Sequence, residues 1–148
     1  MKKILSILVI SALLLTVLAY IIPPAVSAEG GIRVFVEGVE ITFDVPPVMK
    51  NDRVLVPLRK IFEALYMDVD WDGETETITS TGNGNTIVLQ IGNPVARANA
   101  RTVTLDVSAE VVDGRTLVPI RFIAESIGAQ VGWDGDTQTV TVKTNTVW

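Results

Sequence analysis

The chain has 148 residues, with 12 Lys and Arg against 17 Asp and Glu, which gives a formal net charge of −5. An acidic chain repels phosphate backbones, so nucleic acid is not an expected partner. The sequence has no cysteine and no histidine, which removes thiol nucleophiles, thiolate metal sites and the commonest general base and metal ligand. We therefore expect a protein that is not an enzyme, with no catalytic residue, no cofactor and no metal site.

The chain begins with a pattern typical of a secretory signal peptide. Two lysines precede an apolar stretch over 4–22, two prolines end it, and small residues follow up to Ala28. We expect cleavage after Ala28, so that residues 29–148 are secreted and associated with the cell envelope. The alternative is an uncleaved N-terminal anchor, because the stretch approaches the ~20 residues that cross a bilayer. Membrane contact is expected only in that case.

The sequence contains an internal repeat. Residues 34–81 align without gaps on residues 96–143, at an offset of 62, with 17 identities in 48 positions. A repeat of this length indicates a duplicated structural unit. We expect two tandem repeats, at about 32–91 and 94–143, that form one compact domain within 29–148.

Each repeat is predicted to begin with strands and tight turns. Polar and apolar residues alternate along the predicted strands, which cover 32–36 and 39–45 in the first repeat and 95–98 and 101–107 in the second. Residue pairs that tolerate positive φ mark the turns, at Glu37-Gly38, Asn99-Ala100, Asn51-Asp52 and Asp113-Gly114.

A short helix follows in each repeat. Pro57 and Pro119 suit the first helical position, where a missing N–H costs nothing. Apolar residues at i, i+3, i+4 and i+7 then predict a stripe that faces the core, formed by Leu58, Ile61, Phe62 and Leu65 and again by Ile120, Ile123, Ala124 and Ile127. Gly128 predicts a left-handed cap. Tyr66 at the matched position would be strained in that conformation, or the first helix would end differently.

The remaining segments are predicted to be strands, over 68–71, 75–79, 86–91, 130–133 and 137–142. Their connections are too short for parallel crossovers. The predicted fold class is therefore α+β, with mostly antiparallel sheet wrapped around short helices, in two tandem ββ-β-α-ββ repeat units.

Residues Asp68–Gly73 match the opening of an EF-hand calcium loop, D-x-D-x-D-G. The match then fails, because position 12 is Thr79 instead of glutamate, and the second repeat lacks two of the three carboxylates. Alternating acidic residues on an exposed strand face are the simpler interpretation. A protein that binds a small ligand or a divalent cation on the acidic strand face over 68–76 is the alternative functional hypothesis.

Arginine and tryptophan occupy matched positions in the two repeats. Arg59 and Arg121 precede Glu63 and Glu125 by four residues, and we expect intrahelical ion pairs or bracing of the preceding loop rather than an anion site. Arg53 and Arg115 are interpreted in the same way.

Trp71 and Trp133 lie beside matched Asp-Gly turns. We expect them to fill a seam between helix and sheet. If their rings are exposed instead, they would stack on sugar rings, so these two residues are the candidate ligand contacts. Trp148 would be a closing plug or disordered.

The motif R-x-L-V-P-L/I-R, a short helix and W-D-G-x-T-x-T occurs twice, within 32–143. It resembles the copper amine oxidase-like N-terminal domain, also called a stalk domain. The resemblance implies antiparallel sheet around helix in secreted or surface-attached bacterial proteins, often beside cell-wall modules. Oxidase catalysis requires a separate domain with three histidine copper ligands, so the resemblance implies no catalytic residue in this chain.

These patterns together predict a non-enzymatic, exported structural or interaction module at the bacterial cell envelope. Its expected contact is a cell-wall polymer or an envelope protein. The oligomeric state does not follow from the sequence.

Overall fold

The computed structural model describes residues 30–145. The predicted signal peptide or anchor and Trp148 lie outside these residues. The first part of the described chain forms β1 (Arg33–Val36), β2 (Val39–Glu40), β3 (Val48–Lys50), β4 (Arg53–Pro57), α2 (Leu58–Ala64), β5 (Asp68–Asp72), β6 (Thr77–Gly82) and β7 (Asn85–Gln90). The second part forms β8 (Val95–Ala98), β9 (Arg101–Thr104), β10 (Glu110–Val112), β11 (Arg115–Pro119), α3 (Ile120–Ser126), β12 (Gln130–Asp134) and β13 (Thr139–Lys143).

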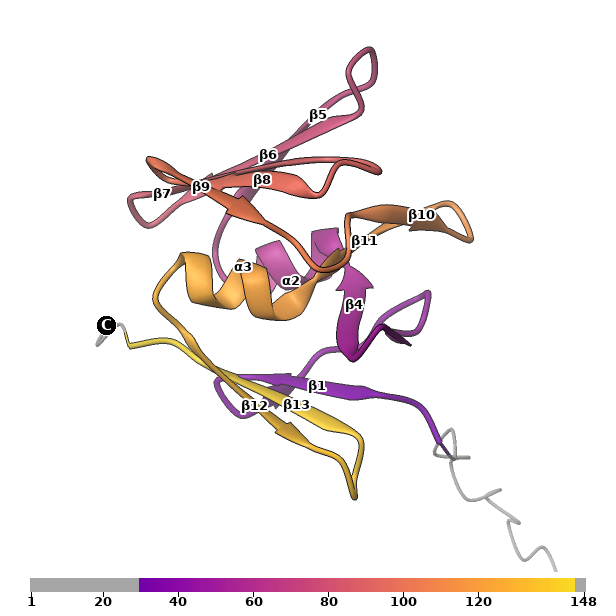
Figure 1. Cartoon of the computed structure of the whole chain (residues 1–148). Coiled ribbons are helices and arrows are strands. Elements are labelled where there is room, and N and C mark those ends of the chain that lie inside the picture. Colours follow the sequence, from indigo (N-terminus) through magenta and orange to yellow (C-terminus); the bar gives the residue numbers. More distant parts are fainter. Residues whose placement is uncertain (1–29, 146–148) are drawn as a thin grey trace, which may run out of the picture.

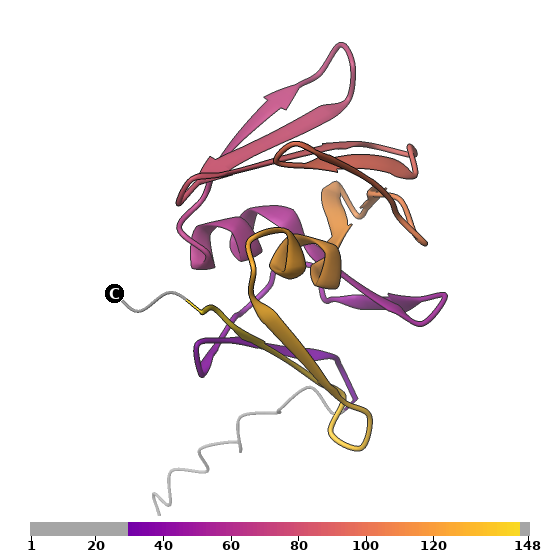
Figure 2. The ribbon, with the colours of Figure 1, turned by 60° about the vertical axis from the view of Figure 1, so that its left-hand side comes forward.

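The two helices lie between sheets (Figures 1 and 2). On one side is a five-stranded sheet in the order β5-β6-β7-β8-β9, and on the other is a terminal sheet in the order β12-β13-β1-β2. A central sheet, in the order β10-β11-β4-β3, lies beside the helices. The predicted α+β class is confirmed. No helix within residues 30–145 is long and apolar enough to span a membrane.

The sheets are mostly antiparallel, as predicted, with one parallel pair between β1 and β13. Val34 lies opposite Val140, and Val36 lies opposite Val142. All four side chains are buried, because alternate residues of both strands point to the helices. The parallel pair thus brings the two ends of the described chain together.

Each of the three sheets contains strands from both predicted repeats. The terminal sheet joins β1 and β2 to β12 and β13, and the five-stranded sheet joins β5, β6 and β7 to β8 and β9. The division at about 91–94 therefore does not separate two bodies. The hydrophobic core likewise combines residues from both halves of the chain.

The central sheet contains the pair in which the two repeats meet. Val56 of β4 lies opposite Val118 of β11, which is its own counterpart 62 residues later. Leu55 is paired with Pro119 and Pro57 with Leu117, so the pair has a local twofold relation. On either side of this pair, α2 contacts β11 and α3 contacts β4.

The prediction of one strand before each helix is wrong, because a hairpin stands there in both halves. β3 pairs with β4, and β10 pairs with β11. The predicted turn pairs connect them: Asn51, Asp52, Asp113 and Gly114 all have positive φ, as type I′ hairpin turns require. The residue types of these turns were recognised, but their flanking strands are too short to alternate clearly.

Other predicted strands end or begin at different residues. β2 ends at Glu40, five residues short of the predicted end at 45, and β9 ends at Thr104, three residues short of the predicted end at 107. Here the chain leaves the sheet, because Val45 and Val107 pack against Leu55 in a second small core beside the central sheet. Burial of apolar side chains therefore overrides the alternating pattern.

Both helices begin one residue later than predicted, at Leu58 and Ile120. Pro57 and Pro119 are the last residues of β4 and β11 and have ψ values of 119° and 113°. The predicted core stripe is confirmed, with Ile127 only partly buried. Each helix also buries one phenylalanine, Phe62 in α2 and Phe122 in α3.

The two helices end in the same way although their capping residues differ. Gly128 has φ 77° and Tyr66 has φ 55°. In the first helix, the Tyr66 N–H donates to the Glu63 carbonyl (3.1 Å) and the Met67 N–H donates to the Phe62 carbonyl (2.9 Å). This is the Schellman pattern, which requires a left-handed residue. Tyr66 therefore adopts the conformation in which strain was predicted.

The left-handed cap at Gly128 gives a prediction of stability. Gly128→Ala should lower the free energy of unfolding by about 1–2 kcal/mol, because a Cβ is disfavoured at this φ. Urea denaturation followed by circular dichroism measures the change. Gly31→Ala is the matched control, since an added Cβ there meets open space and φ is not positive; an equal loss in both variants would contradict the explanation.

The shared sheets predict a single cooperative unfolding transition. Phe62 is fully buried, so Phe62→Ala should lower the free energy of unfolding by about 3–5 kcal/mol and shift the whole transition. Calorimetry on the variant and the parent chain tests this. Two separate transitions, of which only one moves, would show that the halves fold independently.

Candidate functional site: two matched grooves

Two grooves lie where the helices begin. The larger, here called the Trp71 groove, has a volume of about 450 Å³, and the smaller, the Trp133 groove, has a volume of about 110 Å³. Most lining positions of one groove recur in the other at the offset of 62. These pairs are Pro57/Pro119, Leu58/Ile120, Arg59/Arg121, Val69/Val131, Trp71/Trp133, Ile78/Val140, Gly114/Asp52, Arg115/Arg53 and Thr116/Val54.

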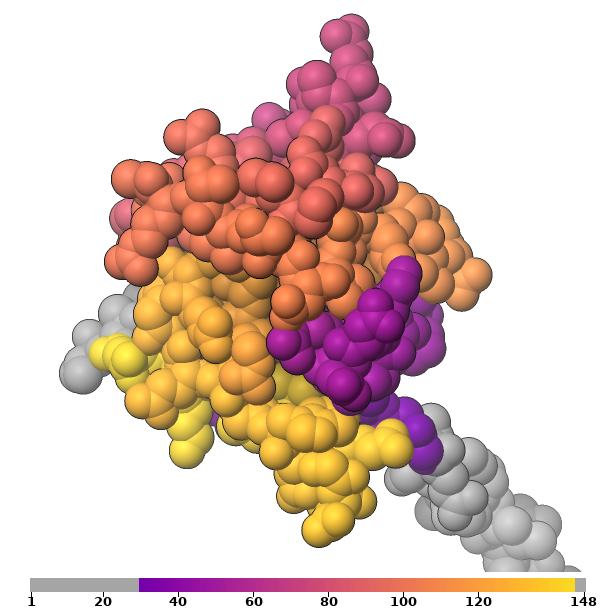
Figure 3. All heavy atoms as spheres, in the orientation of Figure 1, coloured from indigo at the N-terminus to yellow at the C-terminus, as the bar shows by residue number. Residues whose placement is uncertain are grey.

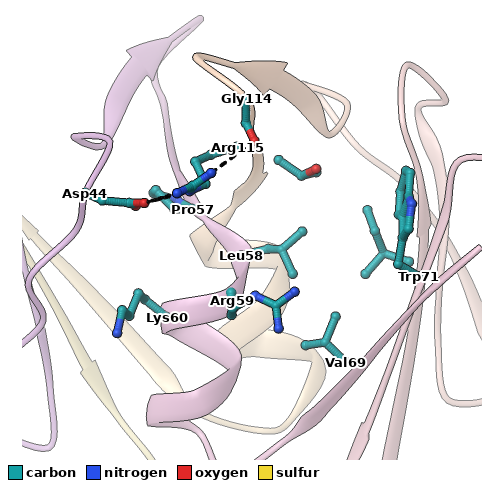
Figure 4. A pocket seen from close by; sticks show the side chains of 11 residues that line it. Asp44, Pro57, Leu58, Arg59, Lys60, Val69, Trp71, Gly114 and Arg115 are labelled. Carbon is teal, nitrogen blue, oxygen red and sulfur yellow. Dashed lines mark hydrogen bonds and ion pairs between the residues drawn. The ribbon is translucent and has the colours of Figure 1, made fainter. Parts of the chain in front are cut away.

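Each groove combines segments from both halves of the chain. The Trp71 groove is formed by the start of α2, by the β5–β6 hairpin and by the beginning of β11. In Figure 4, Arg115 and Asp44 lie on one side and Trp71 lies opposite them, with Leu58 and Arg59 between. The two tryptophan-bearing hairpins project from the body of the molecule (Figure 3).

The tryptophans are exposed, and the prediction that they fill a seam is wrong. Trp71 is 48% exposed and Trp133 is 40% exposed. Each ring lies beside the glycine of its own W-D-G motif: a Cβ added to Gly73 or Gly135 would stand 3.4 or 3.5 Å from the indole nitrogen. The small residue leaves room for the ring against the turn. The structure thus presents both candidate contact residues at the surface of a groove.

The aspartate of the W-D-G-x-T motif forms the hairpin turn. A carboxylate oxygen of Asp72 accepts hydrogen bonds from the backbone N–H groups of Glu74 (2.9 Å) and Thr75 (3.3 Å). Asp134 makes the matched bonds in the second half. The Thr75 side chain and these N–H groups lower the pKa of Asp72. The turn also explains why β6 begins at Thr77, two residues later than predicted.

The aspartates of the apparent calcium motif do not form a calcium loop. Asp68 and Asp70 lie on the extended strand β5, where alternate residues are ~7 Å apart, and Asp72 is engaged in its turn. Within residues 30–145, no group of three or more acidic residues is placed to hold a metal ion. The alternative hypothesis of a cation site on this strand face gains no support from the arrangement.

The strand arginines form ion pairs between the two halves of the chain. Arg115 Nε lies 2.6 Å from the Asp44 carboxylate, and Arg53 Nε lies 2.8 Å from the Asp106 carboxylate. The two arginines are counterparts at the offset of 62, and so are the two aspartates. The sequence analysis missed the two aspartates, although their identity in both repeats was a signal. Each pair fixes the arginine that borders a groove.

The helix arginines differ between the two halves. Arg121 Nη1 lies 3.5 Å from the Glu125 carboxylate, so the predicted pair in α3 is confirmed. The predicted pair of Arg59 with Glu63 is wrong. The Glu63 carboxylate pairs with Lys60 instead, with Nζ 3.8 Å from Oε2. Within residues 30–145, Arg59 has no ion-pair or hydrogen-bond partner. The Trp71 groove therefore contains a guanidinium group that no side chain in the described part of the chain pairs with.

The arrangement has the chemistry of a binding surface. It offers an exposed indole ring, the guanidinium group of Arg59, a fixed arginine–aspartate pair and the Thr116 hydroxyl. Aromatic rings and arginine are the side chains that most often anchor ligands and partners.

The Arg115–Asp44 pair gives a prediction on protonation. The hydrogen bonds from Arg115 lower the pKa of Asp44, so Arg115→Gln should raise that pKa toward the ordinary value of an aspartate. Carboxyl carbon NMR shifts measured across a pH titration would report it. The matched control is Arg53→Gln, which should leave the pKa of Asp44 unchanged.

The same shift has a consequence for stability. A lowered pKa stabilises the folded state above the ordinary pKa of the group, and this contribution is lost as the pH falls through the folded value. The parent chain should therefore be more stable than Arg115→Gln at neutral pH, and the two stabilities should converge in acid. A difference in stability that persists after Asp44 is protonated in both chains would show that the arginine acts through packing instead.

The chain also matches a known protein family. The sequence profile described as copper amine oxidase N-terminal domain matches residues 35–142. No match to a curated protein was found for the chain. The matched region contains the lining of both grooves and nearly all of the three sheets. The domain type is an accessory one, separate from the catalytic part of an oxidase. The chain therefore belongs to the copper amine oxidase N-terminal domain family.

Proposed function

We propose that the protein is a non-catalytic, exported module that binds a polysaccharide of the cell envelope through its Trp71 and Trp133 grooves. The observation that carries the proposal is the exposure of a tryptophan at the matched place in both grooves. Tryptophan is among the side chains most enriched where proteins contact ligands and partners, and here it lines the matched groove in both halves of the chain. Export is supported by the signal-peptide pattern over residues 1–28.

A sugar ring suits this lining. One face of a pyranose carries mainly C–H groups and packs on an indole, while its hydroxyls need hydrogen-bond partners at the rim. Arg115 with Asp44 provides donors and acceptors on the wall opposite Trp71, and Arg53, which is held by Asp106, lines the Trp133 groove. Because each arginine is held by its aspartate, it loses little conformational freedom when a ligand binds.

The duplication favours a repetitive ligand. A polymer presents the same unit many times, so one chain can engage the two grooves, and the second contact then benefits from a high effective concentration. A small soluble ligand gains nothing from two matched sites of this kind. A wall polymer therefore explains both the chemistry and the number of the grooves.

Retention on insoluble cell walls tests the proposal. We expect residues 29–148 to bind walls from the source organism, Trp71→Ala and Trp133→Ala each to weaken retention, and the double variant to lose it. Tyr66→Asn is a matched control, because it removes an exposed ring (74%) outside both grooves and asparagine tolerates positive φ.

Circular dichroism spectra must show that all variants keep the parent fold. A folded double variant that is retained as well as the parent chain would refute the role of the grooves. A parent chain that does not bind walls at all would refute the polysaccharide and would direct the search to an envelope protein.

A further inference from the structure

We infer that the Trp71 groove selects a saccharide unit that carries an anionic group, with Arg59 as the residue that binds this group. The Trp133 groove lacks this selectivity. The inference rests on the proposed function and adds to it the chemistry of the ligand and a difference between the two grooves.

The first observation is the unequal pairing of the matched arginines. Arg121 in the Trp133 groove lies 3.5 Å from Glu125, whereas Arg59 in the Trp71 groove has no partner within residues 30–145. An unpaired guanidinium group offers its full set of donors to an incoming anion, and a bidentate pair with a carboxylate is among the strongest hydrogen-bonded contacts. The neighbouring carboxylate of Glu125 offsets part of the charge of Arg121 and so makes it less attractive to an incoming anion.

The second observation explains this difference at one position. Lys60 follows Arg59 in the sequence, and its Nζ atom lies 3.8 Å from the Glu63 carboxylate, with which it forms an ion pair. Its counterpart in the second half is Phe122, which is buried and has no charge. With no lysine to compete, Glu125 remains with Arg121. The lysine-to-phenylalanine difference between the repeats therefore accounts for the different pairing of Arg59 and Arg121.

The charge of the two linings follows the same division. The Trp71 groove is lined by three cationic side chains and one carboxylate, namely Arg59, Lys60, Arg115 and Asp44. With Glu63, the partner of Lys60, the Trp71 groove has three cationic side chains against two carboxylates. The Trp133 groove has two cationic side chains, Arg53 and Arg121, against three carboxylates: Asp52 lines it, and Asp106 and Glu125 are the partners of its arginines. The chain is acidic as a whole, but charges beyond ~8 Å are largely screened at physiological ionic strength. The local excess of positive charge therefore favours an anion in the Trp71 groove.

The geometry fits a ring that carries its charge at the edge. In Figure 4 the Arg59 guanidinium group lies between α2 and the hairpin that bears Trp71. A hexuronate unit has a ring with a C–H face and one carboxylate outside the ring, so this face can pack on the indole while the carboxylate meets the arginine. The volume of about 450 Å³ is within the range of small-ligand sites, ~300–1,000 Å³. The Trp133 groove, at about 110 Å³, leaves room for less of the ring.

Calorimetric titration with a matched pair of oligosaccharides tests the inference. The probes are tetragalacturonate and its fully methyl-esterified form, which has the same rings without charge. We expect the parent chain to bind the acid at least tenfold more tightly than the ester, since a hydrogen bond to a charged group changes affinity by about that factor or more. Arg59→Gln should abolish this preference, and the matched control Arg121→Gln should keep it. Raising the salt concentration should weaken binding of the acid only.

The outcomes separate this inference from the proposed function. Equal binding of acid and ester, with both lost in Trp71→Ala, would leave a polysaccharide binder and overturn the selectivity. If the folded Arg59→Gln variant still prefers tetragalacturonate over its ester, the role of Arg59 is overturned. It is also overturned if cell walls retain the parent chain but tetragalacturonate does not bind to it. Poly(glycerol phosphate), which has no sugar ring, is the third probe. If it binds as tightly as the acid and does not depend on Trp71, the groove recognises phosphate and the saccharide assignment is wrong.

Discussion

Backbone hydrogen bonds between β4 and β11 join the two halves of the chain at Val56 and Val118, which are counterparts in the sequence repeat. Because each strand faces its own equivalent, the helix that follows one strand packs on the other, so that α2 contacts β11 and α3 contacts β4. Strands from both halves then complete the sheets on either side of the helices. The main hydrophobic core therefore combines buried side chains of both halves.

The pairing of the two halves also creates the grooves. Trp71 comes from the first half of the chain, whereas Arg115 comes from the second and is held by Asp44, 71 residues away. A single repeat would carry a tryptophan with no opposite wall. The grooves are therefore a product of the same pairing that stabilises the core, and their walls keep their positions because the sheets that carry them are shared.

Differences between the repeats affect the core and the surface at once. Phe62 in α2 corresponds to Ala124 in α3, while Phe122 in α3 corresponds to Lys60 in α2. Each helix thus buries one phenylalanine, but at a different place along its length, which keeps the total core volume similar. The shift leaves a lysine at the mouth of the Trp71 groove and none at the Trp133 groove. A change in core packing has in this way altered the charge of a surface site.

The sequence by itself determined the local features: the helix stripes, the left-handed residues of the turns and the cap at Gly128. Each depends on residues within a few positions of one another, so composition and spacing specify them. Only the tertiary structure decided where the strands end, that Trp71 and Trp133 are exposed, and that Arg53 pairs with Asp106 across 53 residues. Those outcomes depend on which segments meet in space, and a duplicated sequence is compatible with pairing either within or between its repeats.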